Sequence, residues 1–249
     1  MYEHFVIITP YHKLGHRIGW HKVLDNDKDY EEVNDVLEKV MKKVGDLKVS
    51  SHVISTNSRN VQSIKDKDNF FHDVAFFEDE FQFIDMYKNE IELTAGDVAK
   101  FILSVGENIT HLKLQKLLYL CYEDFMKLTG TSLFKDKIYA YKYGPVVKSV
   151  YDMYSDKGYS KLDFKEDDSV FLSKIDMLIK PSYSRILFSE AGSGALKSIL
   201  DTLEKFIEFS ASDLVDYTHQ NGTAWSKVYK ENIFNIEITD EVIEQSLSY

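Results

Sequence analysis

The segment from Thr110 to Gly130 constrains the fold most, because it predicts a long helix with a marked beginning and end. Its apolar residues recur at helical spacing, at Leu114, Leu117, Leu118, Cys121, Phe125 and Leu128. They share one broad face, as in a helix packed on a core. Thr110 is a suitable N-cap, and Gly130 suits the left-handed position beyond a helix end. The segment therefore predicts a buried helix at the centre of a helical domain.

Helical patterns dominate the chain after about residue 93. Thr94 with Asp97 and Ser210 with Asp213 each form the spacing of a capping box, which opens a helix. Further helices are expected from Ala195, around Trp225 and after Thr239. Gly144-Pro145 predicts another helix start, since proline at the first helical position loses no intrahelical bond. The glycines at 192 and 194 predict a turn before the helix from Ala195.

The first part of the chain has mixed patterns. Residues 4–9 predict a buried strand that ends at Pro10, and residues 30–44 have helical spacing. Residues 47–56 predict a second strand, and residues 70–87 predict one or two more. The chain is therefore expected to be α+β, with a small α+β domain over residues 1–92 and a mainly α-helical domain over residues 93–249.

Composition restricts the class of partner. The net charge is −11, and both parts are acidic, with 12 basic against 18 acidic residues before residue 93 and 18 against 23 after it. Bulk charge therefore argues against a nucleic-acid partner. One cysteine excludes an intrachain disulfide, and the apolar runs are shorter than the roughly 20 residues that span a bilayer. We expect a cytoplasmic protein without a membrane partner.

One stretch near the N-terminus is rich in histidines, at His12, His16 and His21. The glycines at 15 and 19 argue against a helix that would bring two ligands together, so no metal is expected. The same stretch holds a basic patch of Lys13, Arg17 and Lys22 beside Trp20. This patch is the only basis for a DNA-binding regulator, and a solvated loop is the favoured interpretation.

Three segments, in order and at their spacing, resemble the SocA-like antitoxin domain, also called Panacea. The first is Asp-Val-Ala-Lys-Phe-Ile-Leu at 97–103, followed by Ile-Thr-His-Leu-Lys-Leu-Gln-Lys-Leu-Leu-Tyr at 109–119. The second is Ala-Tyr-Lys-Tyr-Gly-Pro-Val-Val at 140–147 with Val-Tyr at 150–151. The third is Leu-Val-Asp-Tyr-Thr-His at 214–219 with Gly-Thr-Ala-Trp at 222–225. The likeness covers residues 95–249, with Tyr141 where the family usually has Trp and Ala224 where it usually has Pro.

The resemblance implies an antitoxin from a toxin–antitoxin, phage or mobile-element system, which neutralises a partner protein by direct binding. The partner would be a cognate toxin or another target protein. A variant is an adaptor that delivers its toxin to a Clp protease. The resemblance implies no cofactor, metal or catalytic residue. Residues 1–92 lie outside it, and we expect them to help choose the partner.

Eight residues of the shared segments are candidates for a partner interface or for a structural role: Gln115, Lys116, Tyr141, Lys142, Tyr143, Thr218, His219 and Trp225. Polar Gln115 and Lys116 lie among apolar neighbours, so a structural hydrogen bond is favoured for them. The tyrosines at 141 and 143 could either pack on the core at the start of a helix or form a ridge that contacts a partner. An enzyme using His219 with Asp216 is the alternative, but no nucleophile elbow accompanies them and Cys121 lies in the apolar stripe.

Overall fold

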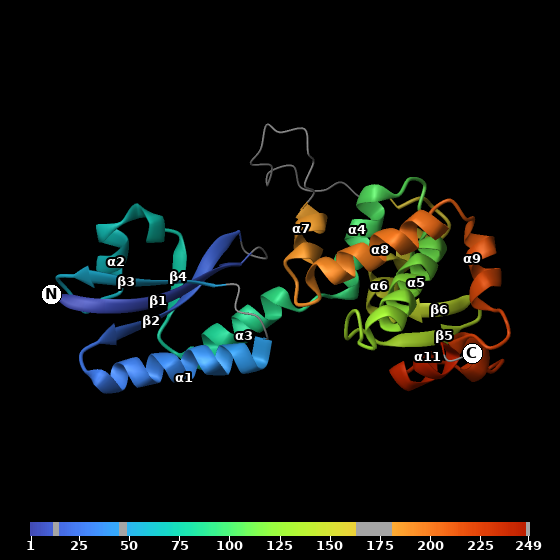
Figure 1. Cartoon of the computed structure of the whole chain (residues 1–249). Coiled ribbons are helices and arrows are strands. Elements are labelled where there is room, and N and C mark those ends of the chain that lie inside the picture. Colours follow the sequence, from blue (N-terminus) through green and yellow to red (C-terminus); the bar gives the residue numbers. More distant parts are fainter. Residues whose placement is uncertain (12–14, 45–48, 163–180, 248–249) are drawn as a thin grey trace. The chain divides into compact units, whose positions relative to one another are not determined.

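The computed structural model describes residues 1–11, 15–44, 49–162 and 181–247. The chain divides into two compact units, residues 1–92 and residues 93–249 (Figure 1). His12 of the histidine-rich stretch and Lys13 of the basic patch lie outside the described residues. Among the helices that are described, none is long and apolar enough to cross a membrane. The molecule is α+β, with a mainly helical second unit.

The first unit is built on a four-stranded sheet with the order β3-β1-β2-β4. Its strands are β1 (Tyr2–Tyr11), β2 (His16–Leu24), β3 (Ser50–Thr56) and β4 (Val74–Phe77). Strand β1 pairs antiparallel with both β2 and β3, whereas β4 runs parallel to β2. The central strand β1 is therefore buried on both faces, which explains its nearly continuous apolar run.

Helices cover both faces of this sheet (Figure 1). Helices α1 (Asp27–Val44) and α3 (Glu80–Ile91) pack on the face that carries Ile7. The short helix α2 (Gln62–Lys67) and the 3-10 turn η1 (Asn69–Phe71) contribute to a second core on the opposite face. Alternate side chains along β1 therefore contribute to two separate hydrophobic cores.

The prediction of a solvated loop around residues 16–22 was wrong, because this segment is strand β2. It pairs with β1 on one side and β4 on the other. Gly19 lies where a Cβ atom would come within 2.7 Å of the Ile7 carbonyl oxygen. The glycine therefore allows close strand contact, whereas from sequence it suggested a break. Likewise, Pro10 does not end β1, since it pairs with Arg17 inside the ladder.

The prediction of one or two strands within residues 70–87 is met by a single strand. Strand β4 is present, but residues after Asp79 form α3. The Asp79 carboxylate accepts a hydrogen bond from the backbone N–H of Phe81 and so caps the helix. Buried Phe83, Ile84 and Tyr87 have the spacing of one helical face, which outweighs the loose alternation before them.

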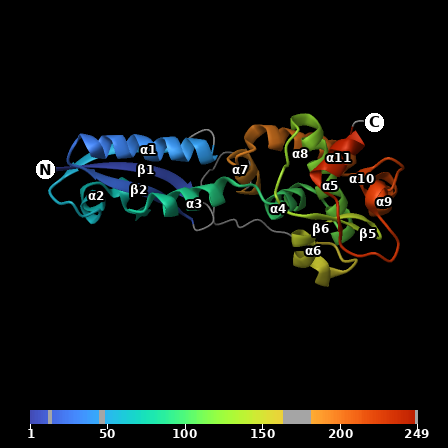
Figure 2. The same ribbon diagram turned by 90° about the horizontal axis from the view of Figure 1, so that it is seen from below.

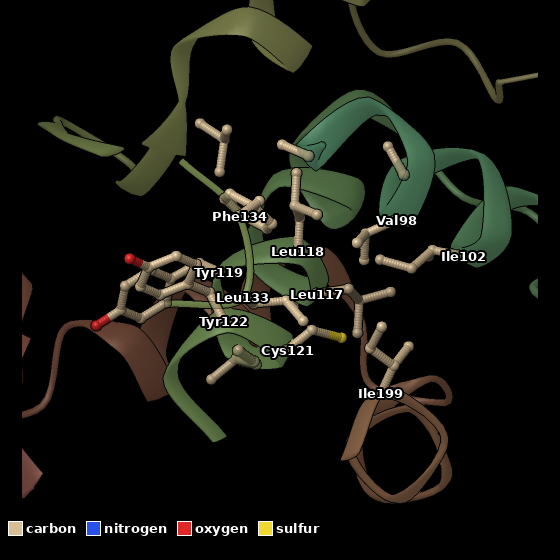
Figure 3. Packing of buried hydrophobic residues seen from close by; sticks show 14 of the residues in the cluster. Val98, Ile102, Leu117, Leu118, Tyr119, Cys121, Tyr122, Leu133, Phe134 and Ile199 are labelled. Carbon is tan, nitrogen blue, oxygen red and sulfur yellow. The ribbon is translucent and has the colours of Figure 1, made fainter. Parts of the chain in front are cut away.

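Helix α5 (His111–Thr129) is the centre of the second unit, as the sequence predicts. Thr110 caps its start, and Gly130 ends it in the left-handed conformation with φ 69°. Helices α4 (Ala95–Val105) and α8 (Gly192–Phe206) pack on it, and α7 (Pro181–Leu187) packs on both of these. Figure 3 shows side chains of α5 converging with Val98, Ile102 and Ile199 in this core.

A three-stranded sheet lies beside α5 (Figure 2). Its order is β6-β5-β7, with β5 (Ile138–Tyr141), β6 (Gly144–Val147) and β7 (Ile236–Glu237). The predicted helix start at Gly144-Pro145 was wrong: these residues form β6, and α6 (Lys148–Tyr154) follows, with the 3-10 turn η2 (Ser155–Lys157) after it. Proline fits because β6 is an edge strand, where a missing N–H leaves no ladder bond broken.

The C-terminal helices are α9 (Ala211–Thr218), α10 (Ala224–Val228) and α11 (Asp240–Leu247). Both predicted capping boxes are confirmed, at the starts of α4 and α9. The predicted short helix bearing Trp225 is also confirmed as α10. The glycines at 192 and 194 belong to the first turn of α8, so the turn predicted there was wrong.

Candidate functional site

Lys116 is a fully buried lysine on the face of α5 that meets the β5–β6 hairpin. None of its surface is exposed, and its Nζ donates a hydrogen bond to the Pro145 carbonyl oxygen at 2.6 Å. Burial disfavours the charged form and lowers the pKa of Lys116 to about 7, from 10.5. This amine therefore fixes the hairpin to the central helix, and its protonation changes near neutral pH.

Gln115 holds the same hairpin one residue earlier on α5. Its Oε1 accepts a hydrogen bond from the backbone N–H of Val147 at 2.8 Å. Its Nε2 is buried and has no hydrogen-bond partner among the described residues. Gln115 and Lys116 thus bind two backbone groups of β6, at Val147 and Pro145. Both side chains are buried inside the unit.

Gly144 and Thr218 close the space around the Lys116 amine. Gly144 has φ +99°, and a Cβ atom there would lie 2.8 Å from Lys116 Nζ and 2.9 Å from Thr218 Oγ1. Thr218 is buried at the end of α9, and its hydroxyl donates to the Leu214 or Val215 carbonyl oxygens, each at 3.0 Å. Only glycine fits at position 144, because of both the backbone angle and the crowding.

Two histidines face the buried amine from different elements. His111 begins α5, and His219 ends α9. Burial lowers the pKa of each, and the Lys116 charge lowers both further. Asp156 opposes this effect at His111, and Asp216 opposes it at His219. The surroundings of Lys116 therefore favour neutral imidazole rings, in keeping with an amine that is itself easily deprotonated.

Trp225 supports the hairpin from the side of α10. Its Nε1 donates a hydrogen bond to the Tyr141 carbonyl oxygen at 2.8 Å. Its ring stacks on His219 at 3.6 Å between centroids and on Tyr229 at 4.5 Å. His219 Nε2 is buried without a hydrogen-bond partner among the described residues, so the side chain acts by stacking, whereas a hydrogen bond was expected. The expected packing role of Trp225 is observed.

The outer side of the hairpin carries the exposed candidates. Tyr143 is 56% exposed, and Lys142 is exposed with its Nζ 5.7 Å from the centre of the Tyr143 ring. Tyr141 is half-buried; its ring meets Tyr151 edge-on, and its hydroxyl donates to Asn235 Oδ1 at 3.4 Å. The structure therefore separates the eight candidates into three sets. Gln115, Lys116 and Thr218 are buried polar residues, Tyr141, His219 and Trp225 pack around the hairpin, and Lys142 and Tyr143 form its exposed turn.

Sequence reasoning missed several members of this site. Tyr229 lies four residues after Trp225, a spacing that indicates a contact on one helical face. Asn235 comes from a distant segment, and no sequence pattern connects it with Tyr141. Tyr151 belongs to the same shared segment as Tyr141, but their ring contact was not predicted. Gly144 was assigned to a helix start, but its role beside Lys116 depends on a tertiary contact across 28 residues of chain.

The basic patch of the first unit is largely neutralised. Arg17 pairs with Asp73, and Lys22 pairs with Glu32 at 2.6 Å. Trp20 is buried, and its Nε1 donates to the Glu78 carbonyl oxygen at 3.1 Å. Arg17, Trp20 and Lys22, which the sequence offered for contact with a phosphate backbone, therefore form contacts inside the unit.

His21 belongs to a buried network. Its Nε2 lies 2.8 Å from His4 Nδ1, and His4 Nε2 lies 2.9 Å from the Ser58 carbonyl oxygen. Because a carbonyl can only accept, His4 Nε2 carries the proton and its Nδ1 accepts from His21 in the neutral pair. Burial, and then the charge of His4, lower the pKa of His21 to about 4. This pair links β1, β2 and the turn after β3.

Other chemistry-bearing groups were also located. Cys121 is buried in the core of the second unit, and burial raises the pKa of its thiol, as expected for an unreactive cysteine. His16 lies in β2, and its Nδ1 contacts the Arg17 carbonyl oxygen. Within the described residues, no group of three or more His, Cys, Asp or Glu side chains is arranged to hold a metal ion.

The fold and the site define a mainly helical domain in which a buried lysine, a glycine and a tryptophan hold a surface hairpin. Residues 114–226 match the model of one family, described as Antitoxin SocA-like, Panacea domain. Residues 114–226 of the second unit are thus similar to a SocA-like Panacea domain, and the matched segment includes all eight candidate residues. No curated protein and no solved structure gives a significant match.

Proposed function

We propose that this protein neutralises a partner protein, a toxin, by direct binding. The observation that carries the proposal is the match of residues 114–226 to an antitoxin domain family. In this proposal the second unit provides the binding scaffold. The first unit, which lies outside the match, helps to select the partner.

The arrangement of the hairpin supports binding as the mode of action. Lys116, Gln115 and Trp225 hold its backbone from beneath, so Lys142 and Tyr143 are presented on a fixed support. Tyrosine is enriched in interface hot spots because it offers a large contact area for few rotatable bonds. A rigid support lowers the entropy lost on binding and so favours a tight complex.

The test is co-expression of this protein with the product of the adjacent reading frame in a bacterial host. We expect the neighbouring product alone to stop growth, and co-expression to restore it through a complex that co-purifies. Tyr143→Ser should weaken that complex at least about tenfold, which corresponds to about 1.4 kcal/mol. Tyr159→Ser is the matched control, because Tyr159 is an exposed tyrosine of the same unit and lies outside the hairpin.

The same experiment separates blocking from degradation. For direct neutralisation, the partner remains present at an unchanged level and is bound. A Clp-dependent adaptor would instead shorten the half-life of the partner, and only in cells that contain the protease. Growth arrest that persists although both proteins are made would contradict the proposal.

A further inference from the structure

A second loop places large apolar side chains near the hairpin tip. Phe234 is 85% exposed and Ile233 is 51% exposed, in the loop that leads into β7. This loop adjoins the hairpin, because β7 pairs with β5 and the Tyr141 hydroxyl bonds to Asn235. Tyr143, Ile233 and Phe234 are named here the apolar ridge. Neither Ile233 nor Phe234 was singled out from the sequence.

The loop has a defined backbone that presents Phe234 outward. Asn232 and Asn235 both adopt left-handed conformations, with φ 63° and 57°. The backbone N–H of Ile233 donates to the Lys230 carbonyl oxygen at 3.2 Å, which closes a turn. Asparagine tolerates the left-handed region better than most residues, so these positions suit the loop. An exposed phenylalanine held in this way gains stabilisation when a partner covers it.

The charges beside the apolar ridge identify the kind of partner. Lys142 and Lys230 are exposed, and neither forms an ion pair with another described residue. Glu231 is the one carboxylate among residues 230–235. On a chain with net charge −11, this surface is locally basic. A complementary partner surface would combine apolar side chains with nearby carboxylates, and these carboxylates would pair with the two lysines.

We propose that the apolar ridge, with Lys142 and Lys230, is a docking surface for an acidic segment of a partner protein that carries apolar side chains. This inference specifies the chemistry of the partner in the proposed function. It rests on that function only for the premise that the partner is a protein. A second copy of this chain and a lipid surface are the other occupants, and the test distinguishes both.

The probe is a library of displayed random peptides, selected against the full-length protein. We expect the selected peptides to be enriched in Asp and Glu together with Leu, Phe or Trp. Their affinity should fall at least tenfold with Phe234→Ser and with Lys142→Glu combined with Lys230→Glu. It should also fall as the salt concentration rises. Leu128→Ser and Lys100→Glu are matched controls, since both residues are exposed elsewhere in the same unit, and neither should change the affinity.

Several results would overturn the inference. Selection of no peptide, of peptides without excess acid, or of peptides that bind Phe234→Ser equally well would each do so. A dimer that Phe234→Ser dissociates would assign the surface to a second copy. Binding to phosphatidylcholine–phosphatidylglycerol vesicles that Phe234→Ser removes would assign it to lipid. The toxin proposal is measured separately by growth rescue, so it can fail while the peptide result stands.

Discussion

At the scale of single residues, the complete burial of Lys116 bears on the stability of the second unit. Moving an ammonium group out of water is costly, and the hydrogen bond to the Pro145 carbonyl offsets only part of this cost, since the pKa of Lys116 falls to about 7. The sequence predicted a hydrogen bond for this residue, because a lysine among Leu114, Leu117 and Leu118 needs a partner. It could not predict the acceptor, which lies 29 residues further along the chain.

This burial predicts a pH dependence of stability that Lys116→Met should remove. The pKa of Lys116 is about 7 in the folded protein and 10.5 without the fold, so between these values the unfolded chain binds more protons. Stability therefore rises with pH across that window, by about 2 kcal/mol between pH 7 and pH 9. Urea unfolding at both pH values, for wild type and Lys116→Met, measures the difference. Equal pH slopes in the two proteins would show that the buried amine does not titrate in this range.

At the scale of elements, the β5–β6 hairpin shows where sequence reasoning succeeded and failed. The segment before Gly144 forms β5. Gly144-Pro145 was assigned to a helix start because proline suits that position. These residues form a strand instead, because they pair with β5. In the first unit, β2 was missed for a similar reason, since strand pairing outweighs the effect of Gly19 within it. Helices with local caps needed no such tertiary information.

The hairpin predicts a large difference between two glycine substitutions with similar backbone angles. Gly144 has φ +99° and is crowded by Lys116 and Thr218, whereas Gly222 has φ +93° and open space where a Cβ would lie. Gly222→Ala should cost about 1–2 kcal/mol for the left-handed backbone alone. Gly144→Ala should cost about 2 kcal/mol more, because the buried contacts must also shift. Chemical denaturation of both variants measures this, and equal losses would mean that the crowding is readily relieved.

At the scale of the whole molecule, the sequence predicted an α+β chain with a helical second part, and the structure confirms this class. Strand order could not be predicted, since the parallel pairing of β2 with β4 joins segments that have no local relation. Residues such as Gln115 and Trp225 were identified from the family resemblance, but their roles in the hairpin required the contacts with Val147 and Tyr141. The exposed Phe234 lay outside every segment that carries the resemblance.

The most direct test of the central claim, that the second unit binds a protein through its supported hairpin, is calorimetric titration. The purified full-length protein would be titrated with the product of the adjacent gene. We expect a saturable complex of fixed stoichiometry, weakened at least about tenfold by Tyr143→Ser and unchanged by Tyr159→Ser. No heat of binding to that product, or equal affinity of all three proteins, would contradict it.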